Sequence, residues 1–258
     1  MPLIFYDVPT WLGGAVLIGL FTLFAVAGIE IVCRFHPTEF RRGYNDITGF
    51  IIAVIGVMNA VLLASVAIIA LENYDRAERS VTREASYLGD ILRMATALPP
   101  EPGEAVRLAA LEYGNAVRDQ EWPVMRKGLM PREGWPRLNE LRDTVMRFEP
   151  ATMRQQNIHG QMINMLDELT DARRERIAFA DEGIKPTVWW VLLLGNLGMV
   201  AFSFLFGLDK RWHQLLSGSF AGLTALVIVL IAALDRPYLG EVSITPNELQ
   251  KAISRMER

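Results

Sequence analysis

The chain has 258 residues, of which 51% are hydrophobic, and a formal charge of −3 at pH 7. This charge excludes a strongly basic nucleic-acid-binding protein. The single cysteine excludes an intrachain disulfide, and no His, Cys or carboxylate spacing matches a zinc or calcium motif, so we predict neither a metal nor a cofactor. The mean hydropathy of +0.22 decides little alone, but the apolar residues gather in four long runs.

The four apolar runs predict transmembrane helices, because about 20 apolar residues are needed to cross the hydrocarbon core of a bilayer. They cover about 11–33, 49–71, 187–208 and 215–234. The first run does not fit a secretory signal peptide, since residues 1–10 contain no Lys or Arg and the run is too long. The chain is therefore expected to be a multi-pass membrane protein whose main partner is the lipid bilayer.

The insertion between the second and third runs predicts a bundle of amphipathic helices. Its apolar residues recur every three or four positions in four segments, about 72–98, 103–120, 133–148 and 152–182. The predicted fold is thus all-α. Its parts are a first transmembrane hairpin (1–71), an extramembrane bundle (72–186), a second hairpin (187–234) and a C-terminal tail with a short amphipathic helix (235–258).

The second run and the first bundle segment share one apolar stripe, and no Pro or Gly lies between Leu71 and Tyr87. We therefore predict one continuous helix over about 49–98, roughly 75 Å long at 1.5 Å per residue. The membrane part of the stripe consists of Gly49, Ala53, Gly56 and Ala60. Small residues let helix backbones approach closely. The stripe either only packs the protein or places the second span along a central pathway in an oligomer.

Polar side chains at membrane depth are candidate functional groups, because burying them in lipid costs free energy. Glu30, near the end of the first run, either reaches the interface or pairs with Arg34, or it acts as a gate or pathway charge. Asn59 and Asn196 lie nearer the middle of their runs. Both asparagines suit hydrogen bonds between helices, and Asn59 alternatively presents its amide dipole to a pathway.

Asn45 and Asp46 stand just before the second run. Their side chains are expected to accept hydrogen bonds from free backbone N–H groups at the start of that helix. Alternatively, the positive end of the helix dipole attracts anions there. The carboxylates of the insertion alternate with arginines, as in residues 171–176, which is typical of ion pairs on solvated helix faces. No catalytic constellation is found, so we do not predict an enzyme.

The charges of the short connectors predict the orientation in the membrane. The first connector carries Arg34, Arg41 and Arg42, and the last carries Lys210 and Arg211. By the positive-inside rule, both connectors face the cytoplasm. The inserted bundle would then lie on the extracytoplasmic side.

Four sequence blocks resemble the bestrophin-like family of bacterial membrane proteins. They are Tyr44–Phe50, Glu121-Trp122-Pro123, residues 202–207, and residues 234–240, which include Asp235, Arg236 and Pro237 at the membrane edge. The resemblance covers nearly the whole chain. It implies a homo-oligomer, such as a pentamer, in the bacterial inner membrane, with the second span lining an anion-conducting pore. It also implies a cytosolic helical domain, opposite to the orientation that the connector charges predict.

Bestrophins close their pore with rings of bulky apolar side chains, and the resemblance implies such a constriction here. The pore-lining or gate candidates in the second span are Ile55, Met58, Asn59, Leu62 and Ile69. Aliphatic rings can gate a pore by excluding water. The predicted function is therefore an oligomeric channel for small anions. The alternative is a non-conducting membrane sensor or scaffold that signals through its helical bundle.

Overall fold

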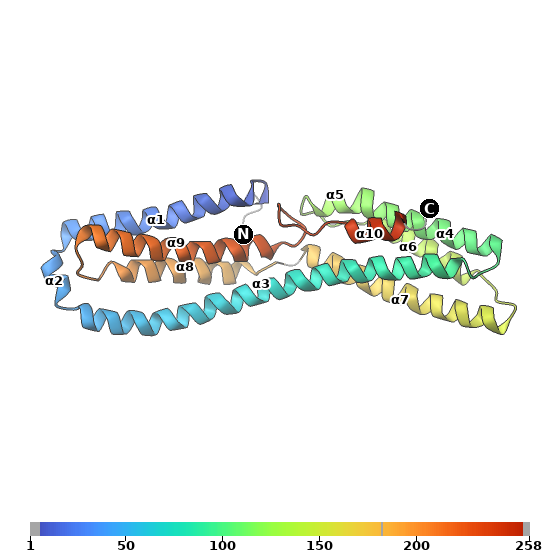
Figure 1. Cartoon of the computed structure of the whole chain (residues 1–258), viewed down its shortest axis with the longest axis horizontal. Helices are drawn as coiled ribbons and strands as arrows, with labels where there is room; N and C mark the ends of the chain where they lie inside the picture. The colour runs from blue at the N-terminus through green and yellow to red at the C-terminus, as the bar shows by residue number, and fades with distance from the viewer. Residues whose placement is uncertain (1–5, 182, 255–258) are drawn as a thin grey trace. The chain divides into compact units, whose positions relative to one another are not determined.

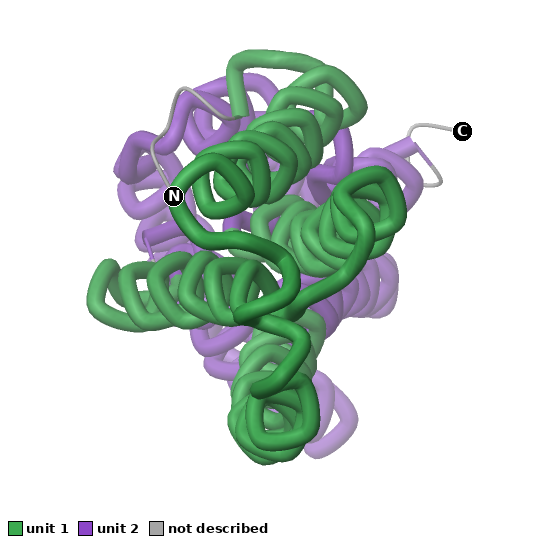
Figure 2. Tube along the Cα trace, turned by 90° about the vertical axis from the view of Figure 1, so that its left-hand side faces the viewer, with its two compact units in different colours: residues 1–72, 184–235 green, residues 73–183, 236–258 purple. Residues whose placement is uncertain are grey.

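The structure is a computed structural model, which describes residues 6–181 and 183–254. In this part of the chain the regular elements are all helices. The chain divides into two compact units, unit 1 (1–72 and 184–235) and unit 2 (73–183 and 236–258) (Figure 2). The C-terminal segment thus belongs to the same unit as the inserted helices.

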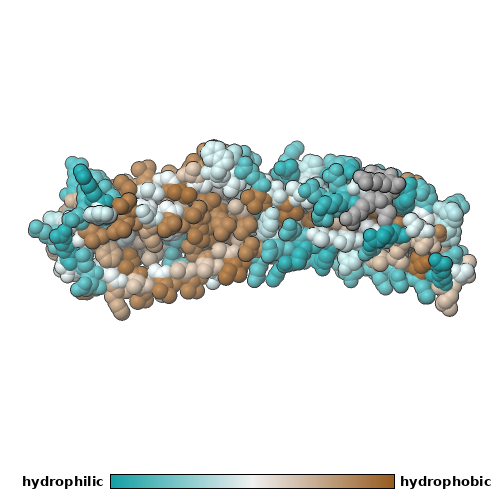
Figure 3. All heavy atoms as spheres, viewed as in Figure 1, coloured by the Kyte–Doolittle hydropathy of each residue, from teal (hydrophilic) through white to brown (hydrophobic). Residues whose placement is uncertain are grey.

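Unit 1 holds the membrane-spanning part of the protein. Its elements are α1 (Thr10–Phe35), α2 (Thr38–Arg42), the first part of α3 (Asn45–Ala95), α8 (Pro186–Ser203) and α9 (Lys210–Asp235) (Figure 1). Among the described residues, four helices are long and apolar enough to cross a membrane, namely α1, α3, α8 and α9. Apolar side chains predominate over the visible face of unit 1 away from its connector end, as a lipid environment requires (Figure 3).

The continuous helix is confirmed: α3 is one α-helix of 51 residues, Asn45–Ala95, and contributes to both units. It begins four residues before the predicted start at Gly49. It ends three residues before Leu98, whose N–H bonds to the carbonyl of Ala95 in a tight turn. The following helix starts at Pro100, because proline suits a first helical turn where its missing N–H needs no partner.

The connection between α8 and α9 differs from the prediction. The third span ends at Ser203 rather than near residue 208, and α9 begins at Lys210, before the predicted 215. Two carbonyls after the end of α8, those of Phe204 and Phe206, accept hydrogen bonds from Nη1 of Arg41 at 2.9 and 2.8 Å. The last carbonyls of α8 itself accept hydrogen bonds from the N–H groups of residues 204–206 in tight turns, and Arg41 holds the connection that follows.

Unit 2 is a helical bundle. It contains the second part of α3, α4 (Pro100–Ala116), the π-helical turn η2 (Val117–Glu121), α5 (Trp122–Met125), α6 (Gly134–Met146), α7 (Met153–Asp181) and α10 (Asn247–Ser254). The predicted end near residue 120 is wrong, since the helical path continues to Met125. The wide turn η2 shifts the register just before Pro123, which has no N–H to donate. The predicted end of the last bundle helix, residue 182, lies outside the described residues.

The core of unit 2 comes from one face of each helix. It includes Leu88 and Ile91 of α3, Val106 of α4, Leu141 of α6 and Leu166 of α7, all fully buried. The C-terminal segment closes this core. Leu249 and Ile253 of α10 are buried in it, and the ring of Tyr238 meets that of Trp122 edge to face at 5.8 Å.

Candidate functional site

The transmembrane part of α3 has one face that packs within unit 1 and one face that is exposed. The packed face is made of buried or half-buried residues, namely Gly49, Ile52, Gly56, Asn59, Leu63, Val66 and Ala70. The exposed face carries Phe50, Val54, Met58, Val61, Ser65 and Ile68. Phe50 and Met58 are 73% and 70% exposed, so unit 1 leaves this face uncovered. We call it the open face of α3.

The five pore candidates do not share one face. Met58 and Ile69 are exposed, whereas Ile55 and Leu62 are half-buried at the border of the packed face. Asn59 belongs to the packed face. Only part of the predicted set is therefore placed where a pathway along the open face of α3 would pass.

Asn59 forms a hydrogen bond between helices. Its Nδ2 donates to Oδ1 of Asn196 on α8 at 2.9 Å, and Nδ2 of Asn196 donates to the carbonyl of Leu192 at 2.7 Å. Asn196 is fully buried. Because a buried amide without partners costs free energy, this pair holds α3 against α8.

The small-residue stripe splits in the same way. A Cβ on Gly56 would lie 3.3 Å from the terminal carbon of Met199, and one on Gly49 would lie 3.9 Å from the ring of Phe206. Gly56 therefore lies against α8, and Gly49 lies near the connection between α8 and α9. Ala53 and Ala60, in contrast, are exposed at the rim of a groove.

Asn45 does not cap its own helix, which corrects the prediction. Its Oδ1 accepts a hydrogen bond from the N–H of Gly207 at 2.8 Å, and its Nδ2 donates to the carbonyl of Gly207 at 3.4 Å. Asn45 thus ties the start of α3 to the connection between α8 and α9. Asp46 is exposed in the first helical turn, where its charge suits the positive helix end.

Glu30 pairs across helices rather than with Arg34. Its Oε1 accepts from Nζ of Lys210 at 2.7 Å, and its Oε2 accepts from Nε2 of Gln214 at 3.3 Å. A second cross-helix pair joins Arg42 to Asp209 at 2.8 Å. Glu30 is thus held at the connector end of α1 and α9, and it does not enter the open face of α3.

Asp235, Arg236 and Pro237 have structural contacts. Asp235 is buried, and its carboxylate accepts hydrogen bonds from the N–H of Ile184 and from Nε1 of Trp189 at 3.2 Å, both at the start of α8. Arg236 donates from Nη1 to the carbonyl of Asp181 at 2.8 Å, and the carbonyl of Pro237 accepts from the N–H of Ile244 at 2.8 Å. The three residues therefore hold neighbouring segments of the chain together, and the carboxylate of Asp235 is buried rather than exposed.

Unit 2 contains a buried ionic cluster that the sequence analysis missed. Both guanidinium nitrogens of Arg173 bind the carboxylate of Glu121, at 2.7 and 2.6 Å. Arg176 binds Glu121 at 2.9 Å and also Glu84. All four side chains are at most 1% exposed. The interpretation of residues 171–176 as a solvated face is therefore wrong for these two arginines, which follow Leu166 and Leu169 on the buried face of α7.

The cluster is electrostatically complementary. Burial alone would raise the pKa of Glu121, but the hydrogen bonds and positive charges of Arg173 and Arg176 outweigh it and lower that pKa to about 2. Tyr113 donates to Glu84 at 2.5 Å, and burial and this carboxylate raise the pKa of Tyr113 well above its usual range. Glu121 therefore stays ionised and paired at neutral pH.

A family model of the bestrophin-like domain matches residues 19–249 of the chain. The chain belongs to the bestrophin-like family. A comparison with curated proteins finds no match. Two point variants of a bacterial bestrophin homologue from Klebsiella pneumoniae have similar folds. One matches with a TM-score of 0.74 at 13% identity, over 95% of this chain and 99% of that one. The other matches with a TM-score of 0.71 at 12% identity, over 93% and 97%.

A further structure of the Klebsiella pneumoniae homologue matches with a TM-score of 0.69 at 13% identity, over 94% of this chain and 96% of that chain. At such low identity, these matches establish the fold of the bestrophin-like chain alone. They agree with its four apolar helices, and the chain is accordingly a membrane protein. Across residues 6–181 and 183–254, no group of three or more His, Cys, Asp or Glu side chains is placed to hold a metal ion.

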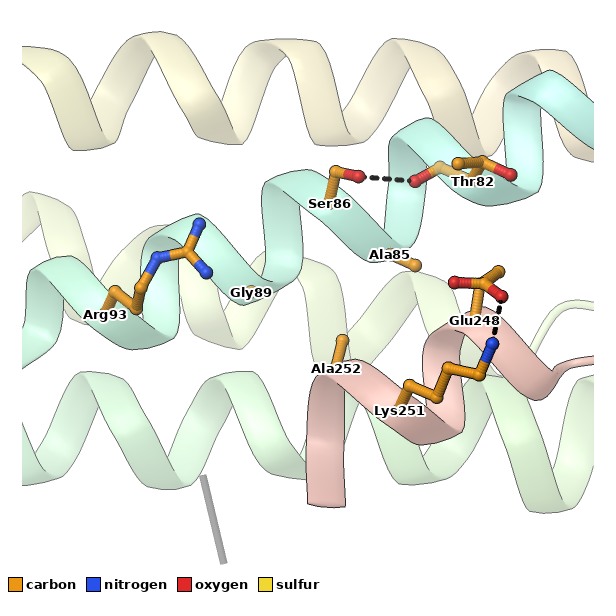
Figure 4. Close-up of a pocket in the computed structure, with 8 residues that line it drawn as sticks. All are labelled: Thr82, Ala85, Ser86, Gly89, Arg93, Glu248, Lys251 and Ala252. Atoms are coloured by element: carbon orange, nitrogen blue, oxygen red, sulfur yellow. Dashed lines mark hydrogen bonds and ion pairs between the residues drawn. The ribbon is translucent and has the colours of Figure 1, made fainter. Parts of the chain in front are cut away.

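The bestrophin-like chain also has a crevice of about 190 Å³ between α3 and α10 (Figure 4). Its polar groups bind one another or their own helices. The hydroxyl of Ser86 donates to the carbonyl of Thr82 at 2.9 Å, Nζ of Lys251 binds Glu248 at 2.6 Å, and Arg93 forms an ion pair within α3. The crevice is therefore the seam where α10 docks on α3, and it offers little to a ligand.

Proposed function

We propose that this bestrophin-like chain assembles into a homo-oligomeric channel for small anions, with the open face of α3 lining the central pathway. The observation that carries the proposal is the division of α3 into a packed face and an open face. A transmembrane helix that is held on one side by α8 can turn its other side toward a symmetry axis. Family membership supports this arrangement.

The open face of α3 suits a pathway with a hydrophobic constriction. Met58 and Val61 are large and exposed, and the hydroxyl of Ser65 is bonded to the carbonyl of Val61 at 2.8 Å, which leaves little polar surface. Rings of such side chains gate by excluding water. Among the five predicted candidates, we keep Met58 and Ile69 as gate residues and assign Asn59 to helix packing.

Replacing Met58 by Ser is expected to raise the current severalfold, because a polar ring no longer excludes water from the constriction. The measurement is planar-bilayer recording of the purified oligomer. The control is Leu20→Ser, because Leu20 is 57% exposed on α1 and lies outside the proposed pathway. If a correctly assembled oligomer carries no current with either Met or Ser at position 58, the channel proposal is contradicted and the sensor or scaffold is favoured.

We further propose that unit 2 lies in the cytoplasm, as the family implies. The connector charges favour the opposite side, and three of these cations form contacts within unit 1. Arg41 binds the carbonyls after α8, Arg42 pairs with Asp209, and Lys210 pairs with Glu30. The positive-inside rule counts the cations themselves, paired or not, so the proposed side rests on family membership against the connector charges.

The orientation is testable with a single cysteine at Asn139, an exposed position of α6. In a Cys33→Ser background, a membrane-impermeant maleimide is expected to label Asn139→Cys only after the cells are permeabilised. Labelling in intact cells would place unit 2 outside and restore the orientation that the connector charges predict.

A further inference from the structure

Unit 1 contains an apolar groove of about 900 Å³ between α3, α8 and α9. Ile52, Ala53 and Ala60 form one wall, and Met199, Leu216 and Phe220 contribute to the others. All three helices cross the membrane, so the occupant of the groove is drawn from the bilayer or from another protein within it. The volume is within the range of pockets that hold small ligands.

One end of the groove is polar and contains an unsatisfied imidazole nitrogen. His213 lines the groove and is 1% exposed. Its Nε2 lies 2.8 Å from the carbonyl of Ser203, so this nitrogen carries a hydrogen and donates it. The other ring nitrogen, Nδ1, is buried and has no hydrogen-bond partner. A buried polar atom in this state calls for a hydrogen-bond partner, and the groove that His213 lines is the adjacent space that can hold one.

A cationic side chain lies at the same end of α8. Arg41 is buried and binds the carbonyl of Phe204, the residue after the one that His213 binds. Its Nε is likewise buried without a partner. Arg41 does not line the groove, but its guanidinium lies near the imidazole of His213, and this positive charge favours an acidic group over a neutral or cationic one.

The groove has the length of one leaflet. Its α3 wall extends from Asn45 to Ala60, which is about 22 Å at 1.5 Å per residue, against about 20–22 Å for half of a bilayer with its headgroup region. The polar end lies where α3 and α9 begin, and the apolar end runs along the spans. An occupant with a head at the interface and one long chain fits this layout.

We propose that the groove binds a long-chain fatty acid, with its carboxyl group at His213 and its chain along the apolar walls. A carboxyl oxygen and Nδ1 of His213 then share one proton in a hydrogen bond, and the bond forms whichever of the two atoms carries the proton. A phospholipid acyl ester has no such proton to share. A helix of a second copy cannot offer its backbone N–H groups to this nitrogen, because they are already bonded within the helix. The proposal goes beyond ion conduction and does not depend on it.

The test is binding of radiolabelled palmitic acid to the purified full chain in detergent, by scintillation proximity, with methyl palmitate as competitor. Palmitic acid is expected to compete at least 10-fold better than its methyl ester, since only the acid has the shared proton. This comparison uses the unaltered protein, so it does not depend on any variant folding correctly.

Two variants and one control locate the site. His213→Phe removes the polar partner and Ala53→Phe fills the groove, so each is expected to weaken palmitate binding at least 10-fold. Ala64→Phe places the same bulk on an exposed position of α3 outside the groove, and binding should stay within twofold. Equal competition by acid and ester, or unchanged binding in both groove variants, would overturn the proposal. Loss of the oligomer in Ala53→Phe, with no palmitate binding by the unaltered chain, would instead assign the groove to a second copy.

Discussion

Replacing Glu121 by Ala is expected to destabilise unit 2 by about 3–5 kcal/mol, because two buried guanidinium groups lose their shared carboxylate. Arg173 loses both of its hydrogen bonds to this carboxylate, and Arg176 keeps Glu84 and the sulfur of Met125. At about 2–4 °C per kcal/mol for a chain of this size, the Tm should fall by about 6 °C or more. Thermal unfolding of the detergent-solubilised protein, followed by circular dichroism, measures the change.

The matched control for this experiment is Glu140→Ala. Glu140 pairs with Arg137 at 3.0 Å, but both side chains are about half exposed, at 53% and 47%. Exposed pairs contribute at most about 1 kcal/mol. A Tm for Glu121→Ala equal to that of the control would show that the cluster contributes no more than a solvated ion pair.

Replacing Gly207 by Ala is expected to disrupt the connector end of unit 1. A Cβ at this position would lie 2.2 Å from the backbone N of Arg42 and 2.7 Å from the carbonyl carbon of Arg41. Backbone atoms cannot rotate away as a side chain does, so the two connectors must separate. The separation also breaks the paired hydrogen bonds between Gly207 and Asn45, each of which contributes about 1 kcal/mol.

The total cost for Gly207→Ala is about 3 kcal/mol or more, since forcing extra atoms into a packed site adds about 1–3 kcal/mol. The control is Gly198→Ala, because a Cβ on Gly198 would meet nothing within 4 Å. Both variants are compared with the unaltered protein by thermal unfolding in detergent. A Gly207→Ala protein as stable as the control would mean that the connectors are not in close contact.

The sequence was sufficient for the elements whose causes are local. Four apolar runs and an uninterrupted helical stripe predicted the spans and the single helix α3, since these depend on length, periodicity and the absence of Pro and Gly. The end of α8 could not be found in this way. The connection that follows it is held by hydrogen bonds from Arg41, which lies more than 160 positions away in the chain.

The candidate site shows the same limit. Large apolar residues of the second span are visible in the sequence, but the face that each occupies depends on where α8 packs, and that is fixed by the bond between Asn59 and Asn196. The buried arginines were missed because neighbouring Asp171 and Arg174 do form a solvated pair. The spacing of Arg173 with Leu166 and Leu169 was the available signal.

The central claim is that the open face of α3 borders a water-filled pathway. Single cysteines at positions 54, 58, 61 and 65 of the open face, and at 55, 59 and 62 on or beside the packed face, are compared in a Cys33→Ser background. During bilayer recording, a negatively charged thiol reagent is expected to alter the current through the open-face variants and to leave the others unchanged. Modification that follows the packed face, or that alters no current at any open-face position, would contradict the account.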